Sequence, residues 1–280
     1  MKYIIHGATG AQGAPLFNRL IAEGKNVFAA VREPAALKGA AAVAIDLSSV
    51  DSLVAAYTDA EGVFVHLPLG PESIRNQYAH TIAQAIRIAR PARVVVSTSG
   101  WPLGIPDDQS ALPTLIRELE KTGVSLAIIA PQLYLENLLL PMVMDSVQNL
   151  RQLPYPLGAN YPVSWCSHLD IAEVAAVLLT NNKVTGVVGV GQLPAITGNE
   201  LAEAFSRHFG RPIGFNSLTP EEFGQRLVPL FGEAAAAEVV AGYKAKALTA
   251  HSAIEQHNSA QKLLDIMPRT VDQWLSDMAL

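Results

Sequence analysis

Three glycines near the start of the chain are spaced so that they could hold a charged group against bare backbone. Gly7, Gly10 and Gly13 lie in the stretch HGATGAQG, directly after the apolar run Tyr3-Ile4-Ile5. A pyrophosphate can approach the backbone only where no Cβ intervenes, and the N-terminus of a following helix offers free N–H groups to its charge. Gly7 would make the turn, and Gly13 would let helix and strand pack closely. Gly10 and Ala11 would then lie beside the phosphates of a dinucleotide.

The second strand indicates which dinucleotide the turn would bind. NAD sites place Asp or Glu near the end of this strand, where the carboxylate holds the ribose 2′-OH. Here the sequence is AAVREP, so Arg32 occupies that region. A guanidinium can bind a 2′-phosphate in a fork, whereas a carboxylate would repel it. We therefore expect NADP(H) rather than NAD(H), with an ordinary solvated arginine as the alternative.

Short apolar runs that alternate with helical patterns would position this turn. The expected strands are Tyr3-His6, Asn26-Val31, Ala42-Asp46, Gly62-Leu67, Arg93-Thr98 and Ser125-Ala130. The expected helices between them are Ala14–Glu23, Ser49–Thr58 and Ser73–Ala89, and Gly24 is placed to end the first helix with a left-handed residue. Continuous apolar strands that alternate with helices predict an α/β fold, a Rossmann-type doubly wound parallel sheet.

The pattern changes after about residue 150. The proline-rich stretch RQLPYPLGANYPVSW predicts a loop with a short extended piece, and Asp170 is a candidate N-cap for a helix over Ile171–Leu179. A strand over Gly186–Val190, a helix over Asn199–Phe209 and an alanine-rich helical piece near Glu233–Ala250 follow. We expect a nucleotide-binding domain over residues 1–150, completed by 161–190. Residues 151–280 would form a smaller, mostly helical subdomain that covers the substrate.

Composition excludes several other classes of protein. Half of the 280 residues are hydrophobic and 16% are charged, which argues against disorder. The net charge of −5 and the lack of a run of Lys or Arg argue against a surface that binds nucleic acid. The single cysteine, Cys166, cannot form an internal disulfide, and the histidines show no metal-binding spacing. The most apolar stretch, Val124 to Met144, is too interrupted to span a membrane, so we expect a soluble, cytoplasmic protein.

Several blocks of the sequence resemble one family. GATGAQG, AAVREP, AIDLSS, APQLYLENLL, WCSHLDIAEVAA and LPAITGNELAEAFSRHFGRPI occur in the order seen in the NmrA-like family of atypical short-chain dehydrogenases. The tail NSLTPEEFGQRL is similar to that of the type 2 NAD(P)H:quinone reductases within it. The resemblance implies a Rossmann domain that binds NADP(H), with a C-terminal subdomain that forms a cleft over the nicotinamide. The family includes both quinone reductases and regulators that bind the dinucleotide without turnover.

The resemblance also implies roles for individual residues. The residues that match the phosphate loop are Gly7, Thr9, Gly10, Gln12 and Gly13, and Arg32 matches the 2′-phosphate site. Asp46 and Leu47 match the adenine contacts, and His66, Leu67 and Pro68 match the loop beside the ribose. Tyr134, Asn137 and Trp165 match positions that line the substrate cleft.

Two departures limit what the resemblance implies. The family's IIRPG is IIAPQ here, so Ala130 replaces an arginine and the contacts of that arginine are missing. Short-chain dehydrogenases also use Tyr-x-x-x-Lys on the helix after the fifth strand. The corresponding stretch, DDQSALPTLIRELEKTG, holds no tyrosine, and its lysine, Lys121, lies at the far end.

The lack of the Tyr-x-x-x-Lys tyrosine, which donates a proton, favours an acceptor whose reduction needs no acid from the protein. Reduction of a ketone requires a proton for the developing alkoxide, whereas hydride addition to a quinone gives an anion that its own ring stabilises. The protein must then hold the quinone flat against the nicotinamide, for which the aromatic and apolar candidates are Leu69, Trp101, Leu103, Tyr134 and Trp165. The candidate polar groups are His66, Ser97, Thr98, Ser99, Tyr134 and His168, although each of the histidines and Ser99 is also typical of a structural role.

Two hypotheses remain from the sequence. The first is an NADPH-dependent reductase of quinones or similar activated acceptors. The second is a sensor that binds NADP(H) and changes its contact with a protein partner. We favour the reductase because the C-terminal region resembles a substrate lid, and we expect no metal. Whether the chain forms a homodimer stays open.

Overall fold

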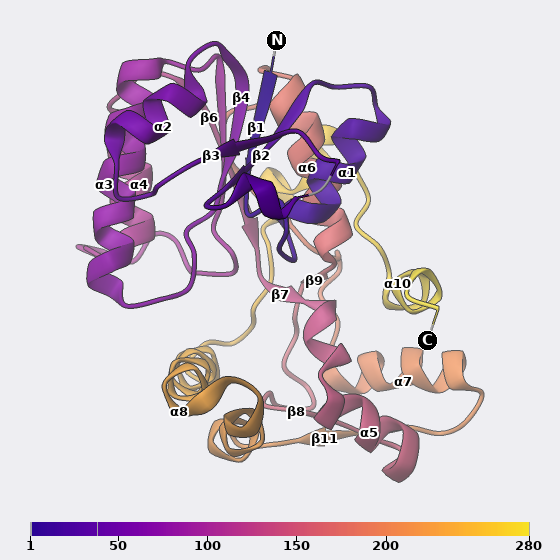
Figure 1. Ribbon diagram of the computed structural model, residues 1–280. Helices are drawn as coiled ribbons and strands as arrows, with labels where there is room; N and C mark the ends of the chain where they lie inside the picture. The colour runs from indigo at the N-terminus through magenta and orange to yellow at the C-terminus, as the bar shows by residue number, and fades with distance from the viewer. Residues whose placement is uncertain (1, 38, 280) are drawn as a thin grey trace. The chain divides into compact units, whose positions relative to one another are not determined.

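A computed structural model describes residues 2–37 and 39–279 (Figure 1). Within this part of the chain the main sheet has seven strands in the order β10-β6-β5-β4-β1-β2-β3, and every neighbouring pair is parallel. The strands are β1 (Lys2–His6), β2 (Val27–Val31), β3 (Ala42–Ala44), β4 (Ala60–Val65), β5 (Arg93–Ser97), β6 (Ser125–Pro131) and β10 (Gly186–Val190). The predicted doubly wound α/β fold is confirmed.

Helices cover both faces of this sheet. Figure 1 shows α2 (Val50–Tyr57), α3 (Glu72–Ala89) and α4 (Ala111–Glu120) together on one face. The other face carries α1 (Gly13–Ala22) and α6 (His168–Thr180), which pack against each other. The chain order reverses between β1 and β4, so the carboxyl ends of these two strands form the switch point where open α/β sheets bind ligands.

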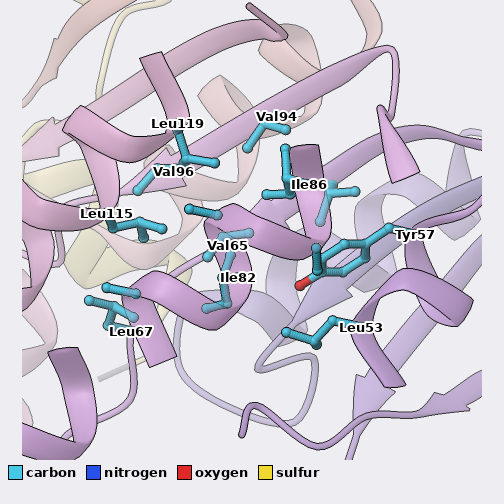
Figure 2. Close-up of a cluster of buried hydrophobic side chains, with 14 of the residues drawn as sticks. Leu53, Tyr57, Val65, Leu67, Ile82, Ile86, Val94, Val96, Leu115 and Leu119 are labelled. Carbon is cyan, nitrogen blue, oxygen red and sulfur yellow. The ribbon is translucent and has the colours of Figure 1, made fainter. Parts of the chain in front are cut away.

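A continuous apolar core lies between the sheet and α2, α3 and α4. Figure 2 shows side chains of this core, among them Leu53, Ile86 and Leu115 from the three helices and Val94 from β5. These four side chains are fully buried, and each contributes about 1.5–3 kcal/mol relative to an exposed side chain. The near-continuous apolar runs of the strands follow from this cover on both faces.

The chain divides into two compact units, which are described separately. Unit 1 contains the chain up to Pro131 together with His168–Val190 and His257–Ile266, which includes α9 (Ala260–Leu264). Unit 2 contains Gln132–Ser167, Gly191–Gln256 and Met267–Leu280. Unit 1 includes residues 168–190, which lie within the expected completion over 161–190, and also residues 257–266, because α6, β10 and α9 complete the cover and edge of the large sheet.

Unit 2 is mostly helical. Its elements are β7 (Leu133–Tyr134), a 3₁₀ turn over Leu135–Leu139, α5 (Pro141–Leu150), β8 (Gln152–Tyr155), β9 (Trp165–Cys166), α7 (Gly198–Phe209), β11 (Gly214–Ser217), α8 (Pro220–Ala247) and α10 (Val271–Asp277). Strand β8 pairs with β11, and β7 pairs with β9. Helix α8 is interrupted at Gly232, whose φ of +81° and ψ of 167° are not helical. Capping boxes begin α7 at Thr197 and α8 at Thr219.

Several local predictions differ from the structure. Helix α6 begins at His168, so Asp170 lies in its first turn and is not the N-cap that we expected. A carboxylate is favoured at both places by the helix dipole and the free N–H groups, so residue type alone does not separate them. Strand β3 ends at Ala44, before the expected Asp46. Gly24 does follow α1 with a φ of +71°, as expected for the left-handed residue that ends a helix.

Candidate functional site: the carboxyl ends of the central strands

The glycine turn joins the end of β1 to the start of α1. Gly7 has a φ of +61°, and its carbonyl accepts a hydrogen bond of 2.8 Å from the N–H of Gly10. A Cβ on Gly13 would overlap the carbonyl of Gly7, so only glycine lets the helix begin this close to the strand. Thr9, Gly10 and Ala11 are exposed, and the side chain of the N-cap residue, Gln12, does not cap the N-terminus of α1. The turn therefore presents bare, open backbone at a helix start.

Gln12 connects this turn to the end of β5. The Ser97 hydroxyl donates to Gln12 Oε1 at 2.7 Å, and Gln12 Nε2 donates to Ser99 Oγ at 3.0 Å. The backbone N–H of Ser99 donates to Ser97 Oγ at 3.2 Å. Ser99 has a φ of +54°, a left-handed conformation that side chains rarely adopt. The network therefore fixes the glycine turn against the turn that follows β5, where Ser99 has its left-handed conformation.

Two histidines lie at the switch point. A Cβ on Gly7 would overlap His66 Nε2, so the imidazole packs directly on the glycine turn. His66 Nε2 is buried and has no hydrogen-bond partner among the described residues. His6 Nε2 shares a 2.8 Å hydrogen bond with the Tyr57 hydroxyl. Burial, and then the proximity of His66, lower the pKa of His6 to about 3.

The pKa of His66 is lowered as well. Burial is the main cause, and a hydrogen bond with the backbone of Leu67 acts in the opposite direction. Both imidazoles are therefore neutral at neutral pH, because a lowered pKa keeps the proton off the ring. A neutral imidazole is a weak acid, and the contact with Gly7 packs the His66 ring on the glycine turn.

Arg32 follows β2, which lies beside β1, and Asp46 follows β3, the edge strand beyond β2. Arg32 comes directly after β2, is exposed, and makes no salt bridge with any residue that the structure describes. Its guanidinium is thus available to an anion near the glycine turn, since His6 and Ala30 are paired in register. Asp46 accepts hydrogen bonds from the backbone and hydroxyl of Ser48, at 2.8 and 2.6 Å, and these bonds lower the pKa of its carboxyl.

Most of the other candidates of unit 1 lie in the loop after β4 and in the segment after β5, while Leu47 follows β3 and His168 begins α6. Thr98 is buried, and Leu67 is nearly so. Leu69 is 84% exposed and Trp101 is 42% exposed. Pro68 and Leu103 are partly buried, as is Leu47 after β3. His168 is partly buried at the first turn of α6.

Two of the three candidates of unit 2, Trp165 and Asn137, contact Tyr155 in an aromatic cluster. Trp165 is 2% exposed and packs edge-on against Tyr155, with ring centroids 5.2 Å apart. Asn137 donates from Nδ2 to the Tyr155 hydroxyl at 3.3 Å, and that hydroxyl lies 2.6 Å from the hydroxyl of Tyr243. Tyr134 is partly buried. The structure thus gives Trp165 a core position within its unit, where its burial leaves little surface for a ligand.

Sequence reasoning missed Arg75 of α3. Its Nη1 pairs with Glu72 Oε2 at 2.7 Å, and its guanidinium carbon lies 4.8 Å from the centre of the Trp101 ring. The residue is 6% exposed, although an arginine in an amphipathic helix usually indicates a solvated face. The local sequence does not indicate this burial, because it arises from a tertiary contact: the loop that carries Trp101 packs onto α3.

Comparison with known proteins places this geometry in a family. Residues 2–275 match the model of the NmrA-like family. The chain belongs to the NmrA-like family. The match spans nearly the entire sequence, in agreement with the motifs that carried the resemblance.

Three known proteins are similar to this chain over most of their length. An NAD(P)H azoreductase from Xenophilus azovorans is 28% identical over 239 residues, which is 80% of this chain and 79% of the relative. A triphenylmethane reductase from Citrobacter sp., solved with NADP(H), superposes with a TM-score of 0.82 at 18% identity, and all of both chains is covered. An NADPH-dependent quinone oxidoreductase from Escherichia coli, solved with NADPH, has a TM-score of 0.75 at 18% identity, again over both complete chains.

Two further observations concern what the described residues do not form. Among residues 2–37 and 39–279, no helix is both long and apolar enough to cross a membrane. Within the same ranges, no three His, Cys, Asp or Glu side chains come together as a set that could hold a metal ion.

Proposed function

We propose that this NmrA-like protein is an NADPH-dependent reductase that transfers a hydride to a quinone or a similar activated acceptor. The observation that carries the proposal is the glycine turn at the switch point, with open backbone at an uncapped helix start. Its relatives include an NAD(P)H azoreductase, and its fold is that of a triphenylmethane reductase and a quinone oxidoreductase.

The residues of the turn fit a dinucleotide. Thr9 and Ala11 would hold the pyrophosphate through backbone N–H groups, Gly10 would leave the approach free of a Cβ, and Gln12 would fix the turn in place. Arg32 would bind the 2′-phosphate of NADP(H), which NAD(H) lacks. Asp46 and Leu47 would lie beside the adenine, and His66, Leu67, Pro68, Ser97 and Thr98 beside the ribose and nicotinamide. When bound, the reduced nicotinamide supplies the hydride.

The type of acceptor follows from the groups that the protein offers. The α4 sequence lacks the tyrosine of a carbonyl reductase, and Lys121 lies at the C-terminus of that helix, paired with Glu118 at 2.6 Å. A quinone that receives a hydride becomes a hydroquinone anion, which takes its proton from water. The protein therefore needs chiefly to orient the ring and exclude competing geometries.

Polar groups of unit 1 would assist this step. Ser99 accepts from Gln12 Nε2, which leaves its own hydroxyl proton for an oxygen of the acceptor. His66 would orient the dinucleotide as a neutral imidazole. We keep His168 as a candidate polar contact, and Trp101 and Leu69 as apolar contacts for the acceptor. In unit 2 we propose Tyr134 and Asn137 as substrate contacts.

The test is the oxidation of NADPH by the purified full-length protein in the presence of a simple naphthoquinone. Loss of the near-ultraviolet absorption of reduced nicotinamide reports hydride transfer directly. We expect turnover with NADPH, and slower turnover with NADH at equal concentration. Tight binding of NADPH with no turnover across quinones, azo dyes and other acceptors would contradict the reductase and favour a regulator that senses the bound dinucleotide.

A further inference from the structure

Lys246 of unit 2 is a partly buried lysine whose charge no carboxylate balances within the described part of the chain. It lies in the last turn of α8, where the helix dipole favours a cation. Lys244 of the same turn already satisfies that preference, because it is exposed and pairs with Glu221 at 2.6 Å. An ammonium that loses water without gaining a counter-charge is unfavourable, so the burial of Lys246 needs another reason.

A chain of hydrogen bonds holds Lys246 and leaves most of its donors open. Its Nζ donates to Ser252 Oγ at 3.2 Å, and Ser252 Oγ donates to Gln132 Oε1 at 3.0 Å. Ser252 is 5% exposed, and its backbone N–H and carbonyl bond to Pro162 and Ser164, so its hydroxyl is fixed in place. An ammonium carries three N–H donors, so two of those of Lys246 have no acceptor among the described residues. Because part of the residue is open to solvent, these donors are available to a ligand.

The same chain of bonds leads to the segment that holds a proposed acceptor contact. Gln132 directly follows the carboxyl end of β6 and directly precedes β7. Gln132 and Tyr134 are partly buried, whereas Leu133 between them is 7% exposed. Side chains two residues apart in extended chain lie on the same side of it. The bonds from Lys246 through Ser252 therefore reach the side of this segment that carries Tyr134, which we propose as a substrate contact.

Burial also makes Lys246 a stronger acid than a solvated lysine. It lowers the pKa of the ammonium, and it is the only cause of that shift. The charged and titratable groups on α8 and on the bonded segments, within three residues of Lys246, Ser252, Gln132 or Pro162, are Tyr134, Tyr161, Tyr243, Lys244, His251 and Glu255. None of them is a cause of the shift. Lys246 is therefore a cation that can both attract an anion and give it a proton.

We propose that Lys246 contacts an oxygen of the quinone acceptor, stabilises the negative charge that forms there and relays a proton to it from water. The inference rests on the proposed reductase function and adds a proton donor to it. Hydride transfer to the quinone oxidises the reduced nicotinamide and moves an electron pair onto a quinone oxygen. The Lys246 ammonium pairs with this oxygen and gives it a proton, which leaves a neutral amine. Water then protonates the amine and restores the charge.

Two substitutions of Lys246 test the assignment in the full-length protein with NADPH. Lys246→Met removes the charge and the proton, and should lower kcat/KM for an unsubstituted naphthoquinone about 10- to 100-fold. Lys246→Arg keeps the charge but holds its proton, and should lower kcat/KM by only about 3- to 10-fold. In the unmodified chain kcat/KM should fall as the pH rises through the lowered pKa of Lys246, because the neutral amine has neither the charge nor the proton. This alkaline limb should be absent from both variants.

Lys244→Met is the matched control, because it removes an exposed lysine from the same turn of α8. Its naphthoquinone kcat/KM should equal that of the unmodified chain, and the Kd of NADPH should be the same in all three variants. A folded Lys246→Met variant with unchanged kcat/KM would overturn the assignment, as would an equal loss in Lys244→Met. If Lys246→Met does not fold, the Lys246→Arg variant decides, and an alkaline limb that persists in it would overturn the role of Lys246 as the acid.

A failure of the proposed function gives a different result. If no acceptor supports the oxidation of NADPH by the unmodified chain, the reductase is wrong, and equilibrium dialysis then tests the anion contact alone. The probe is a ring-hydroxylated naphthoquinone that is an anion at neutral pH, compared with the neutral parent compound. Tighter binding of the anion that is lost in Lys246→Met and kept in Lys246→Arg would support the contact. Equal binding of the anion by the unmodified chain and Lys246→Met, or none by either, would contradict it.

Discussion

Replacement of Gln12 by alanine tests whether the glycine turn is held by the end of β5. The substitution removes the acceptor of the Ser97 hydroxyl and the donor to Ser99 Oγ, two bonds of 2.7 and 3.0 Å. The turn and the strand end are 85 residues apart in sequence, so no local structure replaces the connection.

The magnitude follows from the burial of the two partners. Ser97 is 1% exposed, so its orphaned hydroxyl costs about 1–3 kcal/mol because water cannot reach it. Ser99 is only partly buried, so water replaces its lost bond and the cost is about 1 kcal/mol. We expect Gln12→Ala to lower the free energy of unfolding by about 2–4 kcal/mol.

Urea unfolding followed by far-ultraviolet circular dichroism measures this loss, and hydrogen exchange of the β1 and β5 amides locates it. Ser99→Ala is the matched control, with an expected cost near 1 kcal/mol or less. The double variant of Gln12 and Ser97 should be about 1–2 kcal/mol more stable than additivity predicts, because both single changes remove one shared bond. Additive losses, or a Gln12→Ala variant as stable as the unmodified chain, would refute the network.

Three further predictions concern the same end of the sheet. Gly7→Ala should cost about 1–3 kcal/mol more in unfolding free energy than Gly24→Ala, because both glycines have a positive φ but a Cβ at Gly7 alone meets an imidazole. Equal costs in urea unfolding would contradict that contact. His6 stays neutral in the folded chain down to about pH 3 but takes up a proton near pH 6.5 when unfolded, so its contribution to stability is lost as the pH falls through this range. The slope of the unfolding free energy against pH should reach about 1.4 kcal/mol per pH unit and should be smaller in His6→Gln. An unchanged slope in that variant would show that another group causes it. Arg32→Ala should weaken NADPH binding by about 1.5–3 kcal/mol and leave NADH binding unchanged. Lys25→Ala, which removes an exposed charge before β2, is the control and should change the affinity for neither nucleotide. Equal losses of NADPH and NADH affinity in Arg32→Ala would contradict the proposed contact of Arg32 with the 2′-phosphate.

The sheet was predictable because its strands are buried on both faces. Runs such as Val94-Val95-Val96 are apolar at every position, and this pattern is distinct from the helical periodicity around them. The glycine turn was predictable for a related reason, since only glycine fits where the carbonyl of Gly7 meets the start of α1. Both features can be predicted from short runs of consecutive residues.

The contacts that complete the candidate site join residues far apart in the sequence, so the local sequence pattern does not predict them. From the sequence alone Gln12 is typical of a loop, and only the fold brings Ser97 beside it. Arg75 is typical of a solvated helix face, and only the fold packs Trp101 against it. Trp165 was expected to face a ligand, but its size and apolar character suit the buried aromatic cluster in which it lies. Residue type therefore predicted the backbone of the site better than the orientation of its side chains.

Titration calorimetry of the purified protein with NADPH and with NADH tests the central claim most directly. The glycine turn and Arg32 together predict measurable heat from NADPH and a Kd for NADPH about 10- to 100-fold lower than that for NADH. No heat from either nucleotide, reduced or oxidised, would contradict the dinucleotide site on which the account depends.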